Sequence, residues 1–453
     1  MVERRPDLHV HLLIWDVSLV FGPSRTLDQM FDDWQAHPRI HFHLDGRHPF
    51  VAAHHEKIVC VDDALAFCGG IDLTVKRWDT PEHAPADPRR TDAHDGPYSA
   101  VHDLQMAVGG EAARAVAELA RIHWADAVGE PLEPCSAGAD PWPPTLTHWL
   151  TDVPVGIART RAATGEAPGV HEVAALNARA LAAARRSVYI EAQYLGARPV
   201  ADRLVELLER PDGPEIVILV WRQATGWIER FAMGSNRDRL LRRLAAADRS
   251  GRLRAYWLAA AHEPECEINL HAKLILVDDV FVRIGSSNLN NRSLGFDSEC
   301  DLAIEASDPA TRTAISRFRD TLLAEHLART PEEGRARGRR PWPDRSDRAA
   351  QPRQGAAAGI PDRSGRRPAD ALPGNGAARS GGAAEPRLSP ADAAAHPDSG
   401  LVPGVGSSCS IRSVIARPRG GRGDPNIPAF PGLLHALRAL AMTIRSRRAF
   451  LRR

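Results

Sequence analysis

The sequence predicts an α/β protein made of two similar halves that pack with pseudo-twofold symmetry. Three observations indicate this. β-rich runs alternate with helical stretches in the middle of the chain, one unusual pattern occurs once in each half, and the first half repeats the end of the second half's plan. Alternation of this kind is typical of a layered α/β sheet. We expect a first half at 1–145, a second half at 146–328 and a tail at 329–453.

The second half shows the complete order of elements. β-branched and apolar runs predict its strands, and apolar residues at helical spacing predict its helices. In order, we expect a strand at 153–158, a helix at 171–186, a strand at 187–191, a helix at 200–208, a strand at 215–220, a helix at 229–248, a strand at 253–257 and the strand that begins at Lys273.

The first half repeats only the end of this plan. A strand at 8–15, a helix at 26–35 and a strand at 39–44 match the last helix of the second half and the strands on either side of it. Nothing before residue 145 corresponds to residues 153–209. The repeat therefore predicts that the first half lacks about two strands and their helices, as a truncated gene model or a fragment would, leaving an open sheet edge.

The tail from about residue 329 changes composition. Arg, Ala, Gly, Pro, Asp and Ser dominate it, so it buries too little apolar surface to offset its ordering entropy, and we expect disorder. A genuine linker and a frameshift product explain this composition equally well. Residues 431–453 carry leucines at helical spacing followed by arginines, which predicts a basic amphipathic helix. Such a helix can lie on an anionic membrane, although a short helix without a role is the favoured interpretation.

The most informative feature is a pattern present in two copies. It reads His55-x-Lys57-x4-Asp62-x6-Gly69-Gly70-x-Asp72 in the first half and His271-x-Lys273-x4-Asp278-x6-Gly285-Ser286-x-Asn288 in the second. Residues two apart in a strand share a face, so each histidine lies beside its lysine, whereas the motif aspartates and His54 point to the opposite face. A single copy would be explained by a solvated strand with a chance histidine. Two copies with the same spacing predict one phosphodiester-cleaving site built from both halves.

On these motifs the sequence resembles the phospholipase D superfamily over roughly residues 7–327. The segments Gly69-Gly70-Ile71-Asp72-Leu73, Arg77-Trp78-Asp79-Thr80 and His102-Asp103 are similar to the first half of its phosphatidyl-transferring members. Residues 189–194, Tyr-Ile-Glu-Ala-Gln-Tyr, resemble that group's Ile-Glu-Asn-Gln-Tyr segment, with Ala192 in place of the usual asparagine.

The resemblance implies a role for each motif residue. His55 is expected to attack phosphorus and form a phosphohistidine, while His271 protonates the leaving alcohol and then activates water or another alcohol. Lys57 and Lys273 offset the phosphate charge, helped by Asn288 and Ser286 or by backbone amides of the glycine turns, and Ser286, Asn288, Asp72 and Gly70 are the expected substrate-binding residues. Glu299 is expected to orient His271. Asp79 is our choice for orienting His55, with Asp72 as the second choice.

Other residues near the motifs receive structural or minor roles. Asp62 and Asp278 are expected to pair with turn amides or basic residues at their strand ends. His102-Asp103 is either a supporting pair near the site or an ordinary turn, and the resemblance favours the first. Trp227 and Glu229 are candidates for lining the entrance, although a core tryptophan is the preferred interpretation. The scheme requires no metal and no cofactor.

Composition limits the remaining possibilities. Lys and Arg number 58 against 57 for Asp and Glu, so no basic excess indicates a nucleic-acid partner. Six irregularly spaced cysteines fit a reducing compartment, with Cys60 and Cys68 as buried small hydrophobes. No apolar run approaches the roughly 20 residues of a spanning helix. We expect a cytoplasmic monomer that can associate peripherally with the inner membrane.

The favoured function is hydrolysis or exchange of a glycerophospholipid headgroup. A phosphatidyltransferase of the cardiolipin synthase type would use the same motifs with another lipid as acceptor. A nuclease is the alternative from a different class, and the balanced charge together with the Arg77-Trp78-Asp79-Thr80 segment disfavours it. An inactive remnant is disfavoured because both histidine-lysine pairs are intact.

Overall fold

The computed structural model describes residues 2–16, 37–50, 52–92, 96–135, 141–165, 167–221, 235–260 and 266–327, with three short segments at 356–359, 413–416 and 441–446. These residues belong to one compact unit, which comprises Met1–Ile360 and Cys409–Arg453. The helix predicted at 26–35, the start of the helix predicted at 229–248, and Trp227 and Glu229 lie outside the described residues.

The larger sheet has ten strands within the described part of the chain, and it carries the second motif. β11, β12 and β13 are parallel, whereas β16 is antiparallel to both β11 and β17. Its order is β10 (Val170–His171), β9 (Gly156–Arg161), β18 (Glu299–Glu305), β17 (Phe281–Gly285), β16 (Lys273–Val277), β11 (Ser187–Ala192), β12 (Glu215–Val220), β13 (Leu253–Ala260) and β14 (Cys266–Glu267), with β19 (Ala356–Gly359) beside β13.

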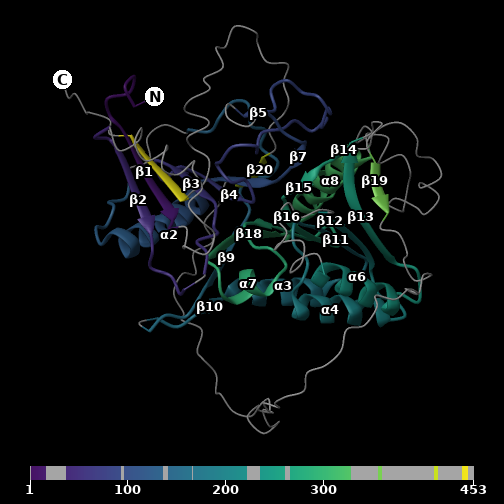
Figure 1. The fold of residues 1–453 in the computed structure, drawn as a ribbon. Coiled ribbons are helices and arrows are strands. Elements are labelled where there is room, and N and C mark those ends of the chain that lie inside the picture. The colour runs from purple at the N-terminus through teal and green to yellow at the C-terminus, as the bar shows by residue number, and fades with distance from the viewer. Residues whose placement is uncertain are drawn as a thin grey trace, which may run out of the picture. The chain divides into compact units, whose positions relative to one another are not determined.

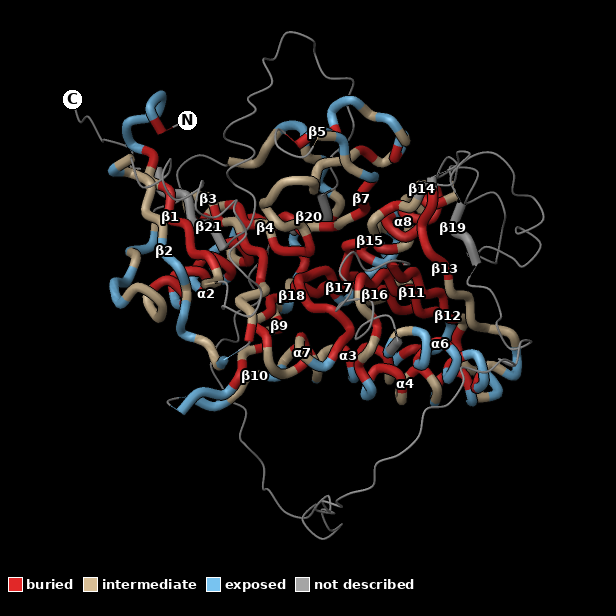
Figure 2. Tube along the Cα trace, viewed as in Figure 1, coloured by how far each residue is buried: buried red, intermediate tan, exposed pale blue. Residues whose placement is uncertain are grey.

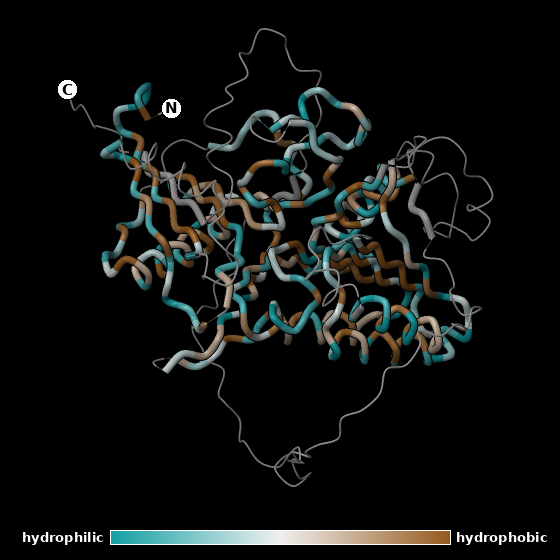
Figure 3. The backbone as a smooth tube through the Cα atoms, viewed as in Figure 1, coloured by the Kyte–Doolittle hydropathy of each residue, from teal (hydrophilic) through white to brown (hydrophobic). Residues whose placement is uncertain are grey.

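Helices bury both faces of this sheet. α3 (Glu172–Ala183), α4 (Arg198–Glu209) and α6 (Ser235–Ala247) gather on one face (Figure 1), and α8 (Pro309–His326) packs on the other. Consequently β11 and β16 are buried along their whole length (Figure 2), as continuous apolar runs at a sheet centre require (Figure 3). A short helix, α7 (Asn291–Gly295), follows the second motif.

Local sequence explains where these helices begin. Pro199 lies in the first turn of α4, and Val200, Leu204, Leu207 and Leu208 form its buried face at helical spacing. At the start of α8 the carboxylate of Asp308 accepts hydrogen bonds from two backbone amides, those of Ala310 and Thr311. No helix among the described residues combines the length and the hydrophobicity needed to cross a membrane.

The smaller sheet has seven described strands and carries the first motif. Helix α2 (Gly110–Val128) packs against β3 and β4. The order is β2 (Ile40–Asp45), β1 (Leu8–Trp15), β21 (Ala441–Ser446), β3 (Ile58–Val61), β4 (Leu65–Gly69), β8 (Gln105–Gly109) and β20 (Ser413–Ala416). Two pairs of very short strands complete the described part: β5 (Thr91–Asp92) with β6 (Gly96–Pro97), and β7 (Val101–His102) with β15 (Asn269–Leu270).

The strand orders of the two sheets can be compared directly. The antiparallel run β3, β4 and β8 has the order and direction of β16, β17 and β18, and the parallel pair β1 and β2 matches β12 and β13. In the larger sheet β11 lies between β16 and β12, and β9 lies beside β18. Strands β21 and β20 hold these two places in the smaller sheet. Among the described residues before 145, no element corresponds to β9, α3, β11 or α4.

The helix predicted for residues 431–453 is wrong where the structure describes that stretch. Residues 441–446 form β21, which pairs with both β1 and β3. Alternating apolar and polar residues from Met442 to Arg445 suit a strand as well as a helix. The neighbouring strands β1 and β3 offer backbone groups that β21 can pair with. This pairing favours a strand at 441–446, because each unpaired buried peptide group is costly.

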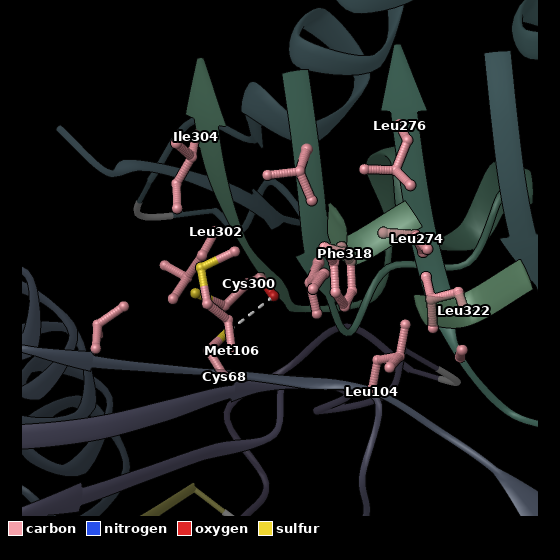
Figure 4. Close-up of a cluster of buried hydrophobic side chains, with 14 of the residues drawn as sticks. Cys68, Leu104, Met106, Leu274, Leu276, Cys300, Leu302, Ile304, Phe318 and Leu322 are labelled. Atoms are coloured by element: carbon pink, nitrogen blue, oxygen red, sulfur yellow. Dashed lines mark hydrogen bonds between the residues drawn. The ribbon is translucent and has the colours of Figure 1, made fainter. Parts of the chain in front are cut away.

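The two sheets meet in a shared apolar core. Cys68 and Met106 of the smaller sheet pack against Cys300 and Leu302 of the larger one (Figure 4), and the Cys68 thiol donates to the carbonyl of Cys300 at 3.2 Å. Phe318 of α8 belongs to the same cluster. Cys60 and Cys68 are buried free thiols, which confirms their prediction as small hydrophobes.

Candidate active site

Each motif lies at the start of a strand that is followed by a tight turn. His55 precedes β3 and His271 precedes β16, near the line where the two sheets pack together. The Asp-Asp pairs that end these strands all have positive φ, from 49° at Asp62 to 58° at Asp279. Aspartate tolerates this conformation, which turns the strand into its antiparallel neighbour. The two motifs are therefore placed by the same local structure.

The two motif histidines are held by carboxylates from opposite parts of the chain. Nδ1 of His55 lies 2.9 Å from both carboxylate oxygens of Glu299, and Nδ1 of His271 lies 2.8 Å from Oδ2 of Asp103. A proton on each Nδ1 can be donated to its carboxylate, which leaves Nε2 as the nitrogen with a free lone pair. This is the tautomer that an attacking or proton-accepting imidazole needs.

The predicted partners of both histidines are corrected by this geometry. Glu299, expected on His271, contacts His55, whereas Asp79, expected on His55, accepts hydrogen bonds from Arg90 and from the amide of Val101. The reason lies in the backbone. Amide hydrogen bonds from His55 to the carbonyl of Ser298, at 3.0 Å, and from His271 to that of His102, at 2.8 Å, tie each motif to the other half. Each motif therefore meets a carboxylate of the half to which it does not belong.

Nitrogen atoms of three basic side chains lie close to the carboxylate of Asp72. Nζ of Lys57 lies 3.2 Å from Oδ1, a nitrogen of Arg77 lies 2.9 Å from Oδ2, and Nε2 of His271 lies 3.6 Å from Oδ2. Burial would raise the pKa of Asp72, but Lys57, His271, Arg77 and His55 hold it well below its usual value. Asp72, the second choice for orienting His55, instead pairs with Lys57. One anionic group therefore reaches residues of both motifs, as a bound phosphodiester must.

The second lysine is more deeply buried than the first. Nζ of Lys273 donates to Oε1 of Gln193 at 2.9 Å and lies 3.1 Å from Nδ1 of His271. Burial, together with Lys57, lowers the pKa of Lys273 to about 7, against the opposing effects of Asp103 and Asp72. Burial and the neighbouring Lys273 likewise lower the pKa of His271 to about 4. An anion entering the site would favour the charged forms of both groups.

The remaining predicted contacts divide into three kinds. Ser286 is fully buried, and its hydroxyl donates to Glu299 at 2.5 Å, so it holds the carboxylate in place. Oδ1 of Asn288 is buried without a hydrogen-bond partner among the described residues, which leaves it available to a ligand. At Gly70 a Cβ atom would lie 2.2 Å from a carboxylate oxygen of Asp103, so only glycine leaves room for that carboxylate.

Asp278 has the structural contacts predicted for it. Its carboxylate accepts hydrogen bonds from three successive backbone amides, those of residues 185–187, at 2.7 to 2.8 Å. This ties the end of β16 to the start of β11. Asp62 occupies the equivalent turn with φ of 49°.

A buried network of histidines and carboxylates lies behind the site. Glu191 accepts hydrogen bonds from the Tyr189 hydroxyl at 2.6 Å and lies 2.7 Å from His102 and 2.8 Å from His326. Its pKa is held well below the usual value, because His102 and His326 outweigh the effect of burial. His102 also contacts Glu325 at 2.9 Å. The network fixes the segment that carries Asp103.

This network predicts a loss of stability in mild acid. Burial lowers the pKa of His326 to about 4, against Glu191, so the unfolded chain binds its proton first as the pH falls. Neutral His326 therefore contributes on the order of 1 to 3 kcal/mol to the free energy of unfolding. This contribution is complete above about pH 6.5 and is lost as the pH falls from about 6.5 to about 4. Urea unfolding at pH 7.5 and pH 5 measures it. We expect a smaller difference between the two pH values in His326→Gln, and an equal difference would contradict the assignment.

Several site residues were missed by sequence reasoning. Asp103 was noted only as part of a possible supporting pair, and Gln193 and Glu191 only as parts of a resembling segment. His326 and Glu325, at the end of α8, carry no motif at all. Periodicity would have placed them on a helix but gave no sign that this helix packs behind the site.

Part of this chain is similar in sequence to known proteins. A phospholipase D family model matches residues 220–339. Phospholipase D1 of Homo sapiens is 45% identical over 102 residues, which cover 19% of this chain and 9% of that protein. Phospholipase D1 of Schizosaccharomyces pombe is 68% identical over 31 residues, 7% of this chain and 2% of that protein. The chain therefore matches only a small part of these curated relatives.

Two solved structures are similar at low sequence identity. Phosphatidylserine synthase of Haemophilus influenzae aligns over 72% of this chain and 85% of its own, with 12% identity and a TM-score of 0.38. Nuc of Salmonella typhimurium, a phospholipase D family member, aligns over 37% of this chain and 93% of its own, with 18% identity and a TM-score of 0.27. The family model and the curated relatives show that the matched part of this mixed α/β chain is similar to members of the phospholipase D superfamily.

Proposed function

We propose that this chain is a phosphodiesterase of the phospholipase D type, which hydrolyses or transfers the headgroup of a glycerophospholipid through a phosphohistidine. The observation that carries the proposal is the position of three carboxylates. Two of them each hold the motif histidine of the other half, and the third, Asp72, lies between residues of both motifs. His55 and His271 are each held by the other half, and the Asp72 carboxylate reaches both Lys57 and His271. The matching order of β3, β4 and β8 with β16, β17 and β18 supports two pseudo-symmetric half-sites.

In the first proposed step, Nε2 of His55 bonds to phosphorus as the bond from phosphorus to the headgroup oxygen breaks. His271 donates its proton to the departing oxygen, so the alcohol leaves neutral. The pKa of His271 is about 4 without substrate, but the charge of a bound phosphodiester favours the imidazolium. The substrate thus brings His271 to the protonation state that the acid role needs.

In the second step, water or an alcohol gives its proton to His271 and bonds to phosphorus, while the bond to His55 breaks. Hydrolysis and transfer then differ only in the acceptor. Lys57 and Lys273 offset the charge of the reacting group. Gln193 and Asp103 position Lys273 and His271 from behind.

A glycerophospholipid is preferred over a nucleic acid because the segment Arg77-Trp78-Asp79-Thr80 beside the site resembles phosphatidyl-transferring phospholipases and because the chain has no excess of basic residues. Arg77 contacts Asp72, and the guanidinium of Arg89 lies 4.7 Å from the ring centre of Trp78. The 58 basic and 57 acidic residues of the chain provide no excess positive charge to attract a polyanion. We infer a phospholipid surface as the place of action.

The test compares three substrates in one assay. Mixed micelles of phosphatidylcholine, phosphatidylethanolamine or phosphatidylglycerol are incubated with and without 1-butanol, and products are identified by mass spectrometry. Plasmid nicking is measured in parallel. We expect phosphatidic acid without butanol and phosphatidylbutanol with it. Nicking without lipid turnover would favour the nuclease, and cardiolipin formed from phosphatidylglycerol would favour the cardiolipin synthase type. The exposed His148→Gln variant serves as the control that keeps full activity.

A further inference from the structure

A second group of buried ligand-type side chains lies on the face of the first motif opposite to His55 and Lys57. His54 and Glu56 alternate with the motif residues, so they point toward α2, where His123 is buried. Nε2 of His54 lies 2.9 Å from Oε1 of Glu56, and Nδ1 of His123 lies 2.5 Å from the same oxygen. The imidazole rings of the two histidines are 5.9 Å apart and nearly perpendicular.

These atoms lie at ion-pair distances, but the angles between them do not meet hydrogen-bond geometry. Both ring nitrogens of His54, Nδ1 of His123 and Oε1 of Glu56 are buried and have no partner of hydrogen-bond geometry among the described residues. The side chains of His54 and Glu56 are 4% and 2% exposed. Buried polar groups are almost always satisfied, so four unsatisfied atoms at one point require an explanation. A shared ion supplies one, because it accepts lone pairs from nitrogen and oxygen together.

We propose that His54, Glu56 and His123 form a binding site for a divalent transition-metal ion of the zinc type. Their three candidate ligand atoms all lie within 4.8 Å of one another. Zinc binds imidazole nitrogen and carboxylate oxygen at about 2.0 to 2.2 Å, which separates neighbouring ligand atoms by about 3.3 Å. Side-chain shifts that bring the three ligand atoms to this spacing would therefore open the site for an ion. Magnesium and calcium are disfavoured because they require mostly oxygen ligands.

The surroundings complete a metal-binding arrangement. Oδ2 of Asp45, at the end of β2, lies 3.2 Å from Nδ1 of His54. A carboxylate behind a ligating imidazole fixes its orientation and increases its basicity. A surface pocket lined by Asp45, Arg47, His54, Glu56 and His123 gives an ion a route of entry and leaves space for a water ligand. The charges of the two carboxylates favour a cation at this point.

A second cluster of histidine and carboxylate side chains serves as a comparison for the proposed metal site. His102, Glu191 and His326 also have ligand atoms within 4.8 Å of one another. Their contacts, however, are hydrogen bonds of 2.7 and 2.8 Å, and the Tyr189 hydroxyl donates to the same carboxylate. The three candidate ligand atoms of this second cluster are thus held by hydrogen bonds, although Nδ1 of His326 also has no partner among the described residues, whereas those of the cluster at His54 are not hydrogen-bonded.

An ion at this site would support the active site without touching substrate. His54 and Glu56 flank His55 in the chain, and His123 anchors them to α2. The ion would cross-link the segment that carries His55 to a 19-residue helix. His54, Glu56 and His123 are then positioning residues for His55, and chelation is expected to weaken catalysis only through that segment.

The test begins with the full chain after exhaustive dialysis against a chelator and then metal-free buffer. Zinc is titrated by calorimetry, and cobalt is added separately to record visible absorption. We expect one tightly bound zinc per chain, cobalt bands of a four-coordinate site, and an X-ray absorption spectrum with nitrogen and oxygen at about 2.0 Å and two imidazoles. These measurements on the unaltered chain do not depend on a variant that folds. Failure to bind zinc, or a spectrum without imidazole, would overturn the proposal.

Variants locate the ion. Glu56→Gln and His123→Gln should lose stoichiometric zinc, and Asp45→Asn should weaken binding about 10- to 100-fold. His326→Gln, in the second cluster, and His148→Gln, on the surface, should bind zinc as the unaltered chain does. Loss of zinc in His326→Gln with retention in Glu56→Gln would move the site to the other cluster and contradict the proposal. Because zinc binding is measured without lipid, it is independent of the proposed catalytic function.

Discussion

Replacing His55 by alanine abolishes headgroup release, with an expected loss of more than about 10⁴-fold in kcat, because the bond to phosphorus then has no nitrogen to form it. His271→Ala is expected to be similarly inactive on natural phospholipids, whose alcohol leaves only after it is protonated. The two variants are expected to differ in their reaction with a phosphodiester of p-nitrophenol. That leaving group needs no proton, so His271→Ala should release p-nitrophenolate in a burst and stop at the phosphorylated enzyme.

The covalent state of the protein decides which histidine attacks. Phosphohistidine survives alkaline quenching, and peptide mass spectrometry can then locate it. We expect the added group on His55 in the His271→Ala variant and no phosphorylated peptide in the His55→Ala variant. Phosphorylated His271 in the second variant would reverse the two roles, and absence of any adduct in either would reject the covalent mechanism. His148→Gln provides the matched control, since its histidine is exposed and belongs to neither motif.

Much of the secondary structure could be predicted because its signals are local. The strands expected at 8–15 and 215–220 are β1 and β12 with the same bounds, and the helix expected at 200–208 is α4, extended by two residues at the start and one at the end. The strand expected at 153–158 begins three residues later, at Gly156. Apolar periodicity decides which residues form an element, but the exact ends depend on sheet partners that the sequence does not name.

The candidate site was predictable only in part, for the same reason. Strand alternation placed Lys57 beside His55 without knowledge of the fold. The partners of the histidines depend on which loop crosses to the other sheet, and this crossing is set by backbone pairs such as His55 with Ser298. The family resemblance suggested Glu299 for His271, but packing between the halves placed it on His55. Residues of α8 behind the site likewise became visible only in three dimensions.

The crossed carboxylates lead to a second prediction of large effect. Glu299→Gln and Asp103→Asn each remove the acceptor that fixes a histidine tautomer, and each should lower kcat/KM on phospholipids by about 10² to 10⁴. Both carboxylates are deeply buried, and their pKa values are held below the usual range by the facing histidines, with the lysines assisting, despite burial. A neutral amide in either place loses that pairing while it keeps the size of the side chain.

The p-nitrophenyl substrate tells which histidine each carboxylate serves. If Glu299 holds the attacking His55, Glu299→Gln should slow the burst as well as phospholipid turnover. If Asp103 holds the acid His271, Asp103→Asn should spare the burst and lose only the steps that need a proton transfer. The opposite pattern would restore the partners expected from sequence and contradict the geometry. Glu305→Gln, an exposed change on the same strand as Glu299, should leave both rates unaltered. A uniform loss in all three variants, with melting curves shifted together, would indicate damage to the fold instead of a crossed pair.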